Sequence, residues 1–208
     1  MDIRLEKVGK RYRLEWIIRN LNLEIRSGER LAIEGPNGSG KSTLQKMLSG
    51  HLSPSAGSIN FISQGNLLER EEIYKHVSMA APYIELIEDF SLEEQIQFHQ
   101  GFRPLLEGYD TEKLIELSGL AKSRKKVIRF YSSGMKQRVK LLLAIFSKSE
   151  LILLDEPSTN LDRAGIGWYI DLLAEHLGKR TLIVASNIEE DFSLCDLRIN
   201  ILDYKKKA

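Results

Sequence analysis

The chain has 208 residues, of which 42% are hydrophobic and 28% charged, so it can bury the core of one domain beneath an ordinary polar surface. Thirty basic and 29 acidic residues give a formal net charge of +1, which lacks the basic excess typical of a nucleic-acid-binding protein. One cysteine excludes an intramolecular disulfide, and no apolar stretch approaches the ~20 residues that span a bilayer. If the protein acts at a membrane, we expect another chain to supply the spanning part.

The first third of the chain predicts a strand, a glycine-rich loop and a helix in succession. A turn at Ser27-Gly28 leads into a short apolar strand at 31–34. The sequence GPNGSGKST then occupies 35–43, and a helix is expected over 42–48. A further strand is expected over 58–62.

The middle of the chain differs from both ends. Residues 86–121 carry helical periodicity, many glutamates and no clear strand. Strand patterns return at 151–155 (LILLD), 181–185 (TLIVA) and 198–202 (RINIL), and helical patterns such as GWYIDLLAEHL lie between them. Strands that alternate with helices predict a mainly parallel α/β sheet with a helical lobe inserted near the middle.

The glycine-rich loop has the spacing of a phosphate-binding loop. GPNGSGKS fits the pattern G-x-x-x-x-G-K-[ST], with Gly35, Gly40, Lys41 and Ser42 at the fixed positions. Glycines permit positive φ and leave room for main-chain N–H groups to converge on an anion, and the following helix aims its positive end at the same place. Lys41 would neutralise the terminal phosphates, and Ser42 could ligate Mg²⁺. An unrelated glycine-rich turn is the alternative, which the strand before the loop and the helix after it disfavour.

The sequence LILLDEP supplies two carboxylates for chemistry at this loop. Four apolar residues place Asp155 at the carboxyl end of a buried strand, the edge where open α/β sheets bind ligands. Asp155 would hold Mg²⁺ through water, and Glu156 would polarise the attacking water as general base. A DE pair at an ordinary strand end is the alternative, and the upstream loop disfavours it.

A second helix start follows the same logic. Ser132, Ser133 and Gly134 precede the apolar run MKQRVKLLLAIF and predict an anion-friendly helix N-terminus. Alone, this is a plain helix cap. Because this helix start lies about twenty residues before LILLDEP, we interpret it as a functional feature.

Together these motifs resemble the ATP-binding subunits of ABC (ATP-binding cassette) transporters nearly end to end. GPNGSGKST resembles the Walker A loop, LILLDEP the Walker B strand and STNLD the D-loop, while YSSGMKQR stands where the LSGGQ signature occurs. Tyr12 is placed like the aromatic residue that stacks on adenine; a core or surface tyrosine is the alternative. The nucleotide contacts that the resemblance implies are Tyr12, Gly35, Pro36, Asn37, Gly38, Ser39, Gly40, Lys41, Ser42, Thr43, Ser132, Ser133 and Gly134. It implies Ser42 and Asp155 as metal ligands and Glu156, Lys41 and Asn187 as catalytic residues.

The resemblance also implies a fold and an assembly. We expect a P-loop NTPase (RecA-like) core with a mainly parallel sheet, an N-terminal antiparallel β part and an inserted α-helical subdomain. Residues 1–208 would form one domain, with the core at 1–83 and 135–208 and the helical subdomain at about 84–134. The cofactors would be ATP and Mg²⁺. The partners would be a transmembrane permease subunit, contacted through the helical lobe, and a second ATPase subunit in a homodimer or heterodimer. No direct contact with nucleic acid is expected.

In such a pair each ATP lies between the Walker residues of one subunit and Ser132 and Gly134 of the other. ATP closes the pair, and hydrolysis reopens it. The protein would sit peripherally on the cytoplasmic face of the membrane, bound through its partner.

Three departures from the family pattern bear on turnover. A glutamine that usually contacts Mg²⁺ falls on Pro82 or Tyr83, and neither residue can replace the amide. Asn187 stands at the position of the switch histidine and cannot be cationic. Ser133 and Met135 replace a glycine and a glutamine of the signature. The sequence therefore predicts a slow ATPase.

Three functions remain open at this point. The leading hypothesis is the energising subunit of a transporter, an exporter by its resemblance to the short ATPase subunits of haem-exporter and ABC-2 types. A nucleotide-gated dimerisation module with little hydrolysis is the second, favoured by the altered glutamine and histidine positions. A soluble ABC ATPase acting on ribosomes or DNA is the third, although such proteins carry two cassettes or long coiled-coil insertions.

Overall fold

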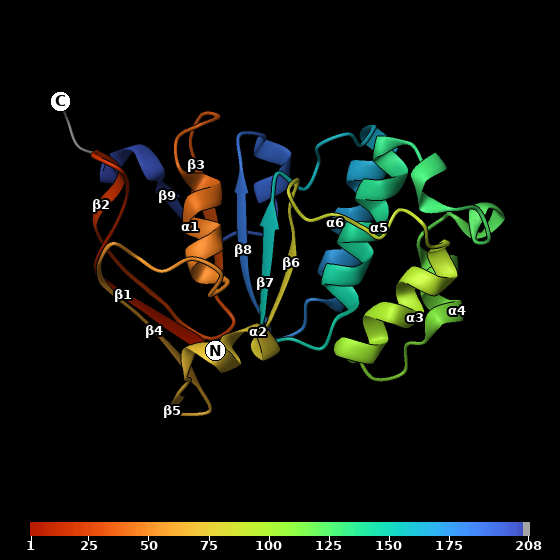
Figure 1. Ribbon diagram of the computed structural model, residues 1–208, viewed down its shortest axis with the longest axis horizontal. Helices are drawn as coiled ribbons and strands as arrows, with labels where there is room; N and C mark the ends of the chain where they lie inside the picture. The colour runs from red at the N-terminus through yellow and green to blue at the C-terminus, as the bar shows by residue number, and fades with distance from the viewer. Residues whose placement is uncertain (206–208) are drawn as a thin grey trace.

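Residues 1–205 are described by a computed structural model, in which the strands form two sheets (Figure 1). The first is antiparallel, with the order β2-β1-β4-β5. Its members are β1 (Asp2–Tyr12), β2 (Glu15–Ile25), β4 (Ala56–Ser63) and β5 (Asn66–Leu67). In β1 the buried Ile3 and Leu5 alternate with the exposed Arg4 and Glu6, as a strand with one face on a core requires. The expected N-terminal antiparallel part is confirmed.

The second sheet is parallel, with the order β6-β7-β8-β3-β9. Its members are β3 (Arg30–Glu34), β6 (Val77–Ala80), β7 (Leu151–Asp155), β8 (Thr181–Ser186) and β9 (Leu197–Asn200). Every residue of β7 and β8 is buried, which explains their continuous apolar runs. The register pairs Asp155 with Ala185 and Glu34 with Ser186, so β3, β7 and β8 end at one common edge. The glycine-rich loop begins at that edge.

The helices are α1 (Lys41–Leu48), α2 (Ile73–His76), α3 (Leu92–Phe102), α4 (Thr111–Leu117), α5 (Ser133–Phe146) and α6 (Arg163–His176). Figure 1 shows α3 and α4 on the far side of α5 from the sheets. A capping box explains the start of α3: Ser91 accepts from the Glu94 N–H, and the Glu94 carboxylate accepts from the Ser91 N–H. The helical character expected for 86–121 is confirmed. Short 3₁₀ helices lie at Arg70–Glu72, Ala121–Ser123, Ile128–Phe130, Glu189–Phe192 and Ile201–Tyr204.

Successive residues of β7 face two different cores. Ile152 and Leu154 pack with the helices on one face of the parallel sheet. Leu151 and Leu153 pack on the other face with α1 and the antiparallel sheet. A parallel sheet covered on both faces, with an antiparallel sheet beside it, confirms the predicted P-loop α/β architecture. Within the described residues, none of the helices combines the length and apolarity that a bilayer crossing requires.

One sequence-based expectation about strands needs correction, and one strand was missed. The strand expected over 198–202 ends at Asn200, and a 3₁₀ helix follows. The Asn200 side chain accepts from the Leu202 N–H at 3.0 Å, a local turn that competes with further pairing. The strand β6 was not expected at all.

Candidate nucleotide-binding site

The loop between β3 and α1 leaves the start of α1 open. Gly40 precedes the helix with φ +112°, and no side chain caps the first turn. A Cβ on Gly40 would lie 2.7 Å from Ile17 Cγ2, so glycine is required there for space as well as for conformation. The first N–H groups of α1 and the positive end of its dipole therefore face the loop without a side-chain partner.

The Ser39 hydroxyl is a second unpartnered group in this loop. Ser39 is only 2% exposed, and its Oγ has no hydrogen-bond partner among residues 1–205. A buried hydroxyl without a partner is costly. A phosphate oxygen would satisfy it, so this part of the loop fits an anionic ligand.

Lys41 places a cation at the centre of the loop. Its side chain is 5% exposed, and its ammonium donates to the carbonyl oxygens of Gly35 at 2.7 Å and Pro36 at 3.4 Å. The same nitrogen lies 3.0 Å from Glu156 Oε1. The loop carbonyls thus aim the lysine, and one carboxylate neutralises it.

Asp155 is a buried carboxylate without hydrogen bonds. It is fully buried at the end of β7, and neither carboxylate oxygen has a hydrogen-bond partner within the part of the chain that the structure describes. Burial raises the pKa of Asp155, and the nearby Ser42 opposes the shift although its hydroxyl makes no regular hydrogen bond to the carboxylate. Such a group fits a hard cation, because Mg²⁺ prefers oxygen ligands.

The described residues supply only part of a coordination shell. In residues 1–205 no group of three or more His, Cys, Asp or Glu side chains is arranged to hold a metal ion. Mg²⁺ commonly takes one or two carboxylates or hydroxyls and completes its shell with phosphate oxygens and water. Ser42 and Asp155 match that partial shell.

Glu156 turns back toward the loop instead of extending β7. Its φ of +48° lies in the left-handed region, which is strained for a glutamate, and its N–H donates to Ala185 O at 2.7 Å. This turn directs the carboxylate to Lys41. Its other oxygen, Oε2, lies 3.4 Å from the Ser186 hydroxyl.

The loop residues and Glu156 line one cleft of about 440 Å³, whereas the fully buried Asp155 does not reach its surface. Its lining consists of Tyr12, Ile17, Asn37, Gly38, Ser39, Gly40, Lys41, Ser42, Thr43, Glu156 and Thr159. Tyr12 stands at the rim with 49% of its surface exposed. The fold therefore brings together the loop, one acidic residue of LILLDEP and the aromatic residue that the sequence singled out.

Comparison with known sequences identifies the family. The sequence model of the ABC transporter family matches residues 18–159. The chain belongs to the ABC transporter family. Its relatives include an uncharacterized ABC transporter ATP-binding protein, YhcH of Bacillus subtilis, 32% identical over 98% of this chain and 68% of its own length. They also include the spermidine/putrescine import ATP-binding protein PotA of Fusobacterium nucleatum, 28% identical over 99% of this chain.

The chain spans only 56% of the length of that import protein. Among solved structures, the ATP-binding cassette MJ0796 in a post-hydrolysis state with ADP and Pi superposes with a TM-score of 0.81. The two sequences are 23% identical, and the match covers 95% of this chain and 93% of the other. This likeness confirms the ABC ATPase fold.

The signature-like residues of this ABC protein lie outside the cleft. Ser132 and Ser133 are exposed at the start of α5, where the Ser132 hydroxyl accepts from the Met135 N–H at 3.2 Å and caps the helix. Gly134 packs against the loop after β7, because a Cβ there would lie 2.8 Å from Asn160 O. The start of α5 and the loop that precedes α1 both lie at the carboxyl edge of the parallel sheet (Figure 1).

Asn187 follows β8 at the same edge and is exposed, and it does not line the cleft. Tyr83, one of the two residues at the glutamine position, lies near Asp155, where burial and the Asp155 charge raise the pKa of its hydroxyl. The Lys46 ammonium sits 4.0 Å from the centre of the Tyr83 ring. Pro82 contributes a carbonyl that accepts from Lys140 at 3.3 Å.

Gln45 is a structural residue that sequence reasoning missed. Its side-chain amide is buried and donates to Leu154 O at 3.1 Å and Ile183 O at 3.3 Å, which fixes α1 beneath the sheet. A lone amide on the apolar face of a short helix was the available signal.

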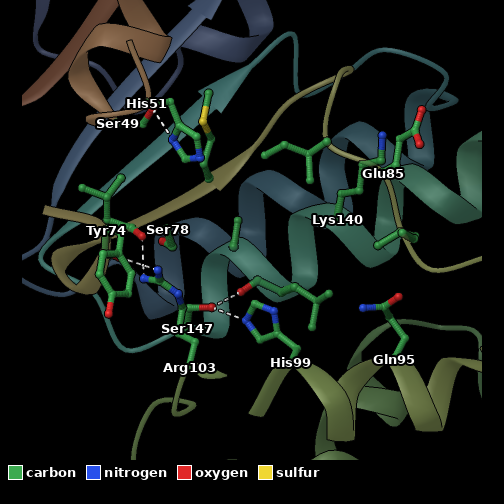
Figure 2. A pocket seen from close by; sticks show the side chains of 16 residues that line it. Ser49, His51, Tyr74, Ser78, Glu85, Gln95, His99, Arg103, Lys140 and Ser147 are labelled. Atoms are coloured by element: carbon green, nitrogen blue, oxygen red, sulfur yellow. Dashed lines mark hydrogen bonds between the residues drawn. The ribbon is translucent and has the colours of Figure 1, made fainter. Parts of the chain in front are cut away.

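A second cavity of about 230 Å³ lies between β6, α3 and α5 (Figure 2). Figure 2 shows Lys140 extending from α5 toward Glu85 and Arg103 extending from the end of α3. The Arg103 guanidinium donates to Val77 O at 2.5 Å and to Tyr74 O. Burial, with the Arg103 charge, lowers the pKa of His99 to about 4, and His99 Nε2 lies 2.8 Å from Ser147 Oγ.

Proposed function

We propose that this chain is the ATP-binding and ATP-hydrolysing subunit that energises a membrane ABC transporter. The observation that carries the proposal is the buried Asp155, whose two oxygens have no hydrogen-bond partner in the described residues, beside an open helix N-terminus, Lys41 and Glu156. A polyphosphate with a divalent cation satisfies all of these groups at once.

Each group then has a defined task. The loop N–H groups, the Ser39 hydroxyl and Lys41 bind phosphate oxygens, while Ser42 and Asp155 hold the cation. When bound, Mg²⁺ would neutralise charge on the phosphate oxygens. Glu156 exchanges its contact with Lys41 for a water molecule, which it orients and deprotonates as the water attacks the terminal phosphorus. Tyr12 offers its exposed ring for stacking on the adenine of the nucleotide.

A second ATPase subunit completes the site in this proposal. Ser132, Ser133 and Gly134 lie outside the cleft of their own chain, and they present a capped but exposed helix start to a partner. Head-to-tail pairing places them on the nucleotide of the other subunit. The proposed boundaries remain 1–83 and 135–208 for the core and about 84–134 for the helical subdomain.

The helical lobe offers the surface for a permease. Phe98 and Phe102 on α3 are 44% and 78% exposed, and their ring centres are 4.9 Å apart. Exposed aromatic pairs are uncommon on surfaces that face only water. We propose that a transmembrane permease subunit covers this lobe, which holds the chain on the cytoplasmic face of the membrane. We propose export as the direction. This rests on the sequence resemblance alone, because the relatives include a protein named for import.

Phosphate release by the purified chain tests the proposal. Wild type with ATP and Mg²⁺ is expected to turn over slowly, because Pro82 or Tyr83 stands where the family has glutamine, and Asn187 stands where it has histidine. Glu156→Gln is expected to fall by about 10²–10³-fold, the usual cost of losing a direct catalytic contact. Equal turnover of wild type and Glu156→Gln would exclude hydrolysis by a homodimer of this chain.

A nucleotide-gated dimerisation module is the second candidate. Asn187 favours this module, because its side chain is exposed, carries no positive charge and does not line the cleft. Light scattering with and without ATP separates the two functions. ATP-dependent dimers that form without phosphate release would support the module and contradict the energising subunit.

A further inference from the structure

Asp191 is a buried carboxylate that the reaction described above does not use. It lies in the 3₁₀ helix Glu189–Phe192, directly after β8, and is 4% exposed. No lysine, arginine or histidine forms an ion pair with it among residues 1–205. A buried carboxylate needs several hydrogen bonds to remain charged.

Three hydroxyl groups supply those bonds. Asp191 Oδ2 accepts from Ser186 Oγ at 2.5 Å and from Ser158 Oγ at 2.9 Å, and Oδ1 accepts from the Tyr169 hydroxyl. The donors come from three elements: the end of β8, the loop after β7, and α6. Asp191 therefore joins the end of β8, the loop after β7 and α6 through one buried acceptor.

Ser186 is the link to the candidate catalytic base. Its oxygen lies 2.5 Å from Asp191 and 3.4 Å from Glu156 Oε2, and it also accepts from the Ile188 N–H at 3.1 Å. A serine hydroxyl has one proton to donate. The shorter distance assigns that proton to Asp191, so Glu156 Oε2 receives no hydrogen bond from Ser186 and keeps its lone pairs for water.

We propose that Asp191 is a positioning residue for ATP hydrolysis, which holds the Ser186 proton away from Glu156 and so keeps the base free. The proposal rests on the proposed function, because it assumes that Glu156 acts as the base. Without the Asp191 carboxylate, the Ser186 hydroxyl would rotate and donate to Glu156 Oε2. A carboxylate oxygen that accepts such a bond has one lone pair fewer to offer the attacking water, so it orients that water less well.

The test is turnover by the full chain carrying Asp191→Asn, which keeps the size of the side chain. Its amide oxygen can accept from Tyr169, and its NH₂ group then faces Ser186 and cannot accept. We expect kcat to fall by about tenfold, the size of one charge-assisted hydrogen bond, while KM for Mg-ATP stays within about twofold. Adding Ser186→Ala to Asp191→Asn removes the competing proton and is expected to restore most of kcat.

Two control variants separate positioning from a general loss of structure. Tyr169→Phe removes another hydrogen bond to Asp191 but leaves its contact with Ser186, and Glu190→Gln changes the exposed neighbour in the same 3₁₀ helix. Glu190→Gln is not expected to change kcat, and Tyr169→Phe is expected to lower kcat less than Asp191→Asn does, because the Ser186 contact remains. Asp191→Ala, followed by thermal melting, provides a second variant if Asp191→Asn is unstable.

Several results would overturn the proposal: an Asp191→Asn kcat equal to wild type, a Ser186→Ala/Asp191→Asn double variant no faster than Asp191→Asn, or unfolding of both Asp191 variants. The last result would assign Asp191 to the fold alone. Failure of the proposed function is distinct, because wild type itself would then release no phosphate, and the positioning role would fall with it.

Discussion

The Lys41 ammonium and the Glu156 carboxylate form a 3.0 Å ion pair in which the two side chains are only 5% and 19% exposed. Nucleotide binding and water activation both need this pair to separate, because Lys41 is required at the phosphates and Glu156 at the water. The ion pair therefore opposes nucleotide binding. It also holds both groups within reach of the site before the ligand arrives.

Glu156→Gln should for this reason tighten ATP binding while it removes hydrolysis. The amide competes less for Lys41 and does not repel the phosphates, so we expect the Kd for Mg-ATP to fall by about three- to tenfold. Calorimetric titration measures it, with Glu190→Gln, an exposed glutamate, as the control. Weaker binding by Glu156→Gln would show that the pair helps to form the site.

Asp155→Asn should stabilise the nucleotide-free protein. The substitution removes a buried charge whose two oxygens have no hydrogen-bond partner from residues 1 to 205, and we expect a gain of about 1 kcal/mol in the free energy of unfolding at neutral pH. The same variant should lose most of the additional stabilisation that Mg²⁺ gives in the presence of ATP.

Thermal melting with ATP, with and without Mg²⁺, measures both effects. Asp171→Asn on the exposed face of α6 is the matched control and should behave as wild type. If Asp155→Asn melted earlier than wild type without ligand and kept the full Mg²⁺ effect, Asp155 would not be the cation ligand.

His99 should make stability depend on pH in the acid range. Burial lowers the pKa of His99 to about 4 in the folded chain, whereas an exposed histidine has a pKa near 6.5. Between these values the unfolded chain binds a proton that the folded chain does not, so stability falls as the pH drops through this window and gains nothing from His99 above it. Because the ring is partly exposed, we expect a loss of about 2 kcal/mol rather than the full shift.

His99→Gln isolates this contribution, since glutamine can still donate to Ser147 Oγ. Urea unfolding at several pH values between 4 and 7 should give a shallower pH dependence for His99→Gln than for wild type. Parallel curves would show that folding does not lower the pKa of His99.

The strongest sequence signals were local ones. The strand, loop and helix around Gly35–Thr43 follow from glycine spacing, and the position of Asp155 follows from four apolar residues before it. Both depend on short-range physics that a sequence displays directly. The antiparallel N-terminal part came instead from the family resemblance.

What the sequence did not show depends on contacts between distant segments. The strand β6 has only four residues, VSMA, and takes its conformation from pairing with β7. Asp191 belongs to the acidic run EEDF, which resembles a solvated surface, and only the fold brings Ser158, Ser186 and Tyr169 around it. The Lys41–Glu156 ion pair is likewise set by the left-handed turn at Glu156.

The central claim is that the loop at Gly35–Thr43 binds the phosphates of a nucleotide through Lys41 and the open end of α1. The most direct measurement is the Kd for Mg-ATP of wild type, Lys41→Ala and the exposed control Lys179→Ala, obtained by calorimetry with folding checked by circular dichroism. We predict that Lys41→Ala weakens binding by about 100-fold, because it removes charge-assisted bonds to phosphate, and that Lys179→Ala binds as wild type. Equal affinity of folded Lys41→Ala and wild type would contradict the claim.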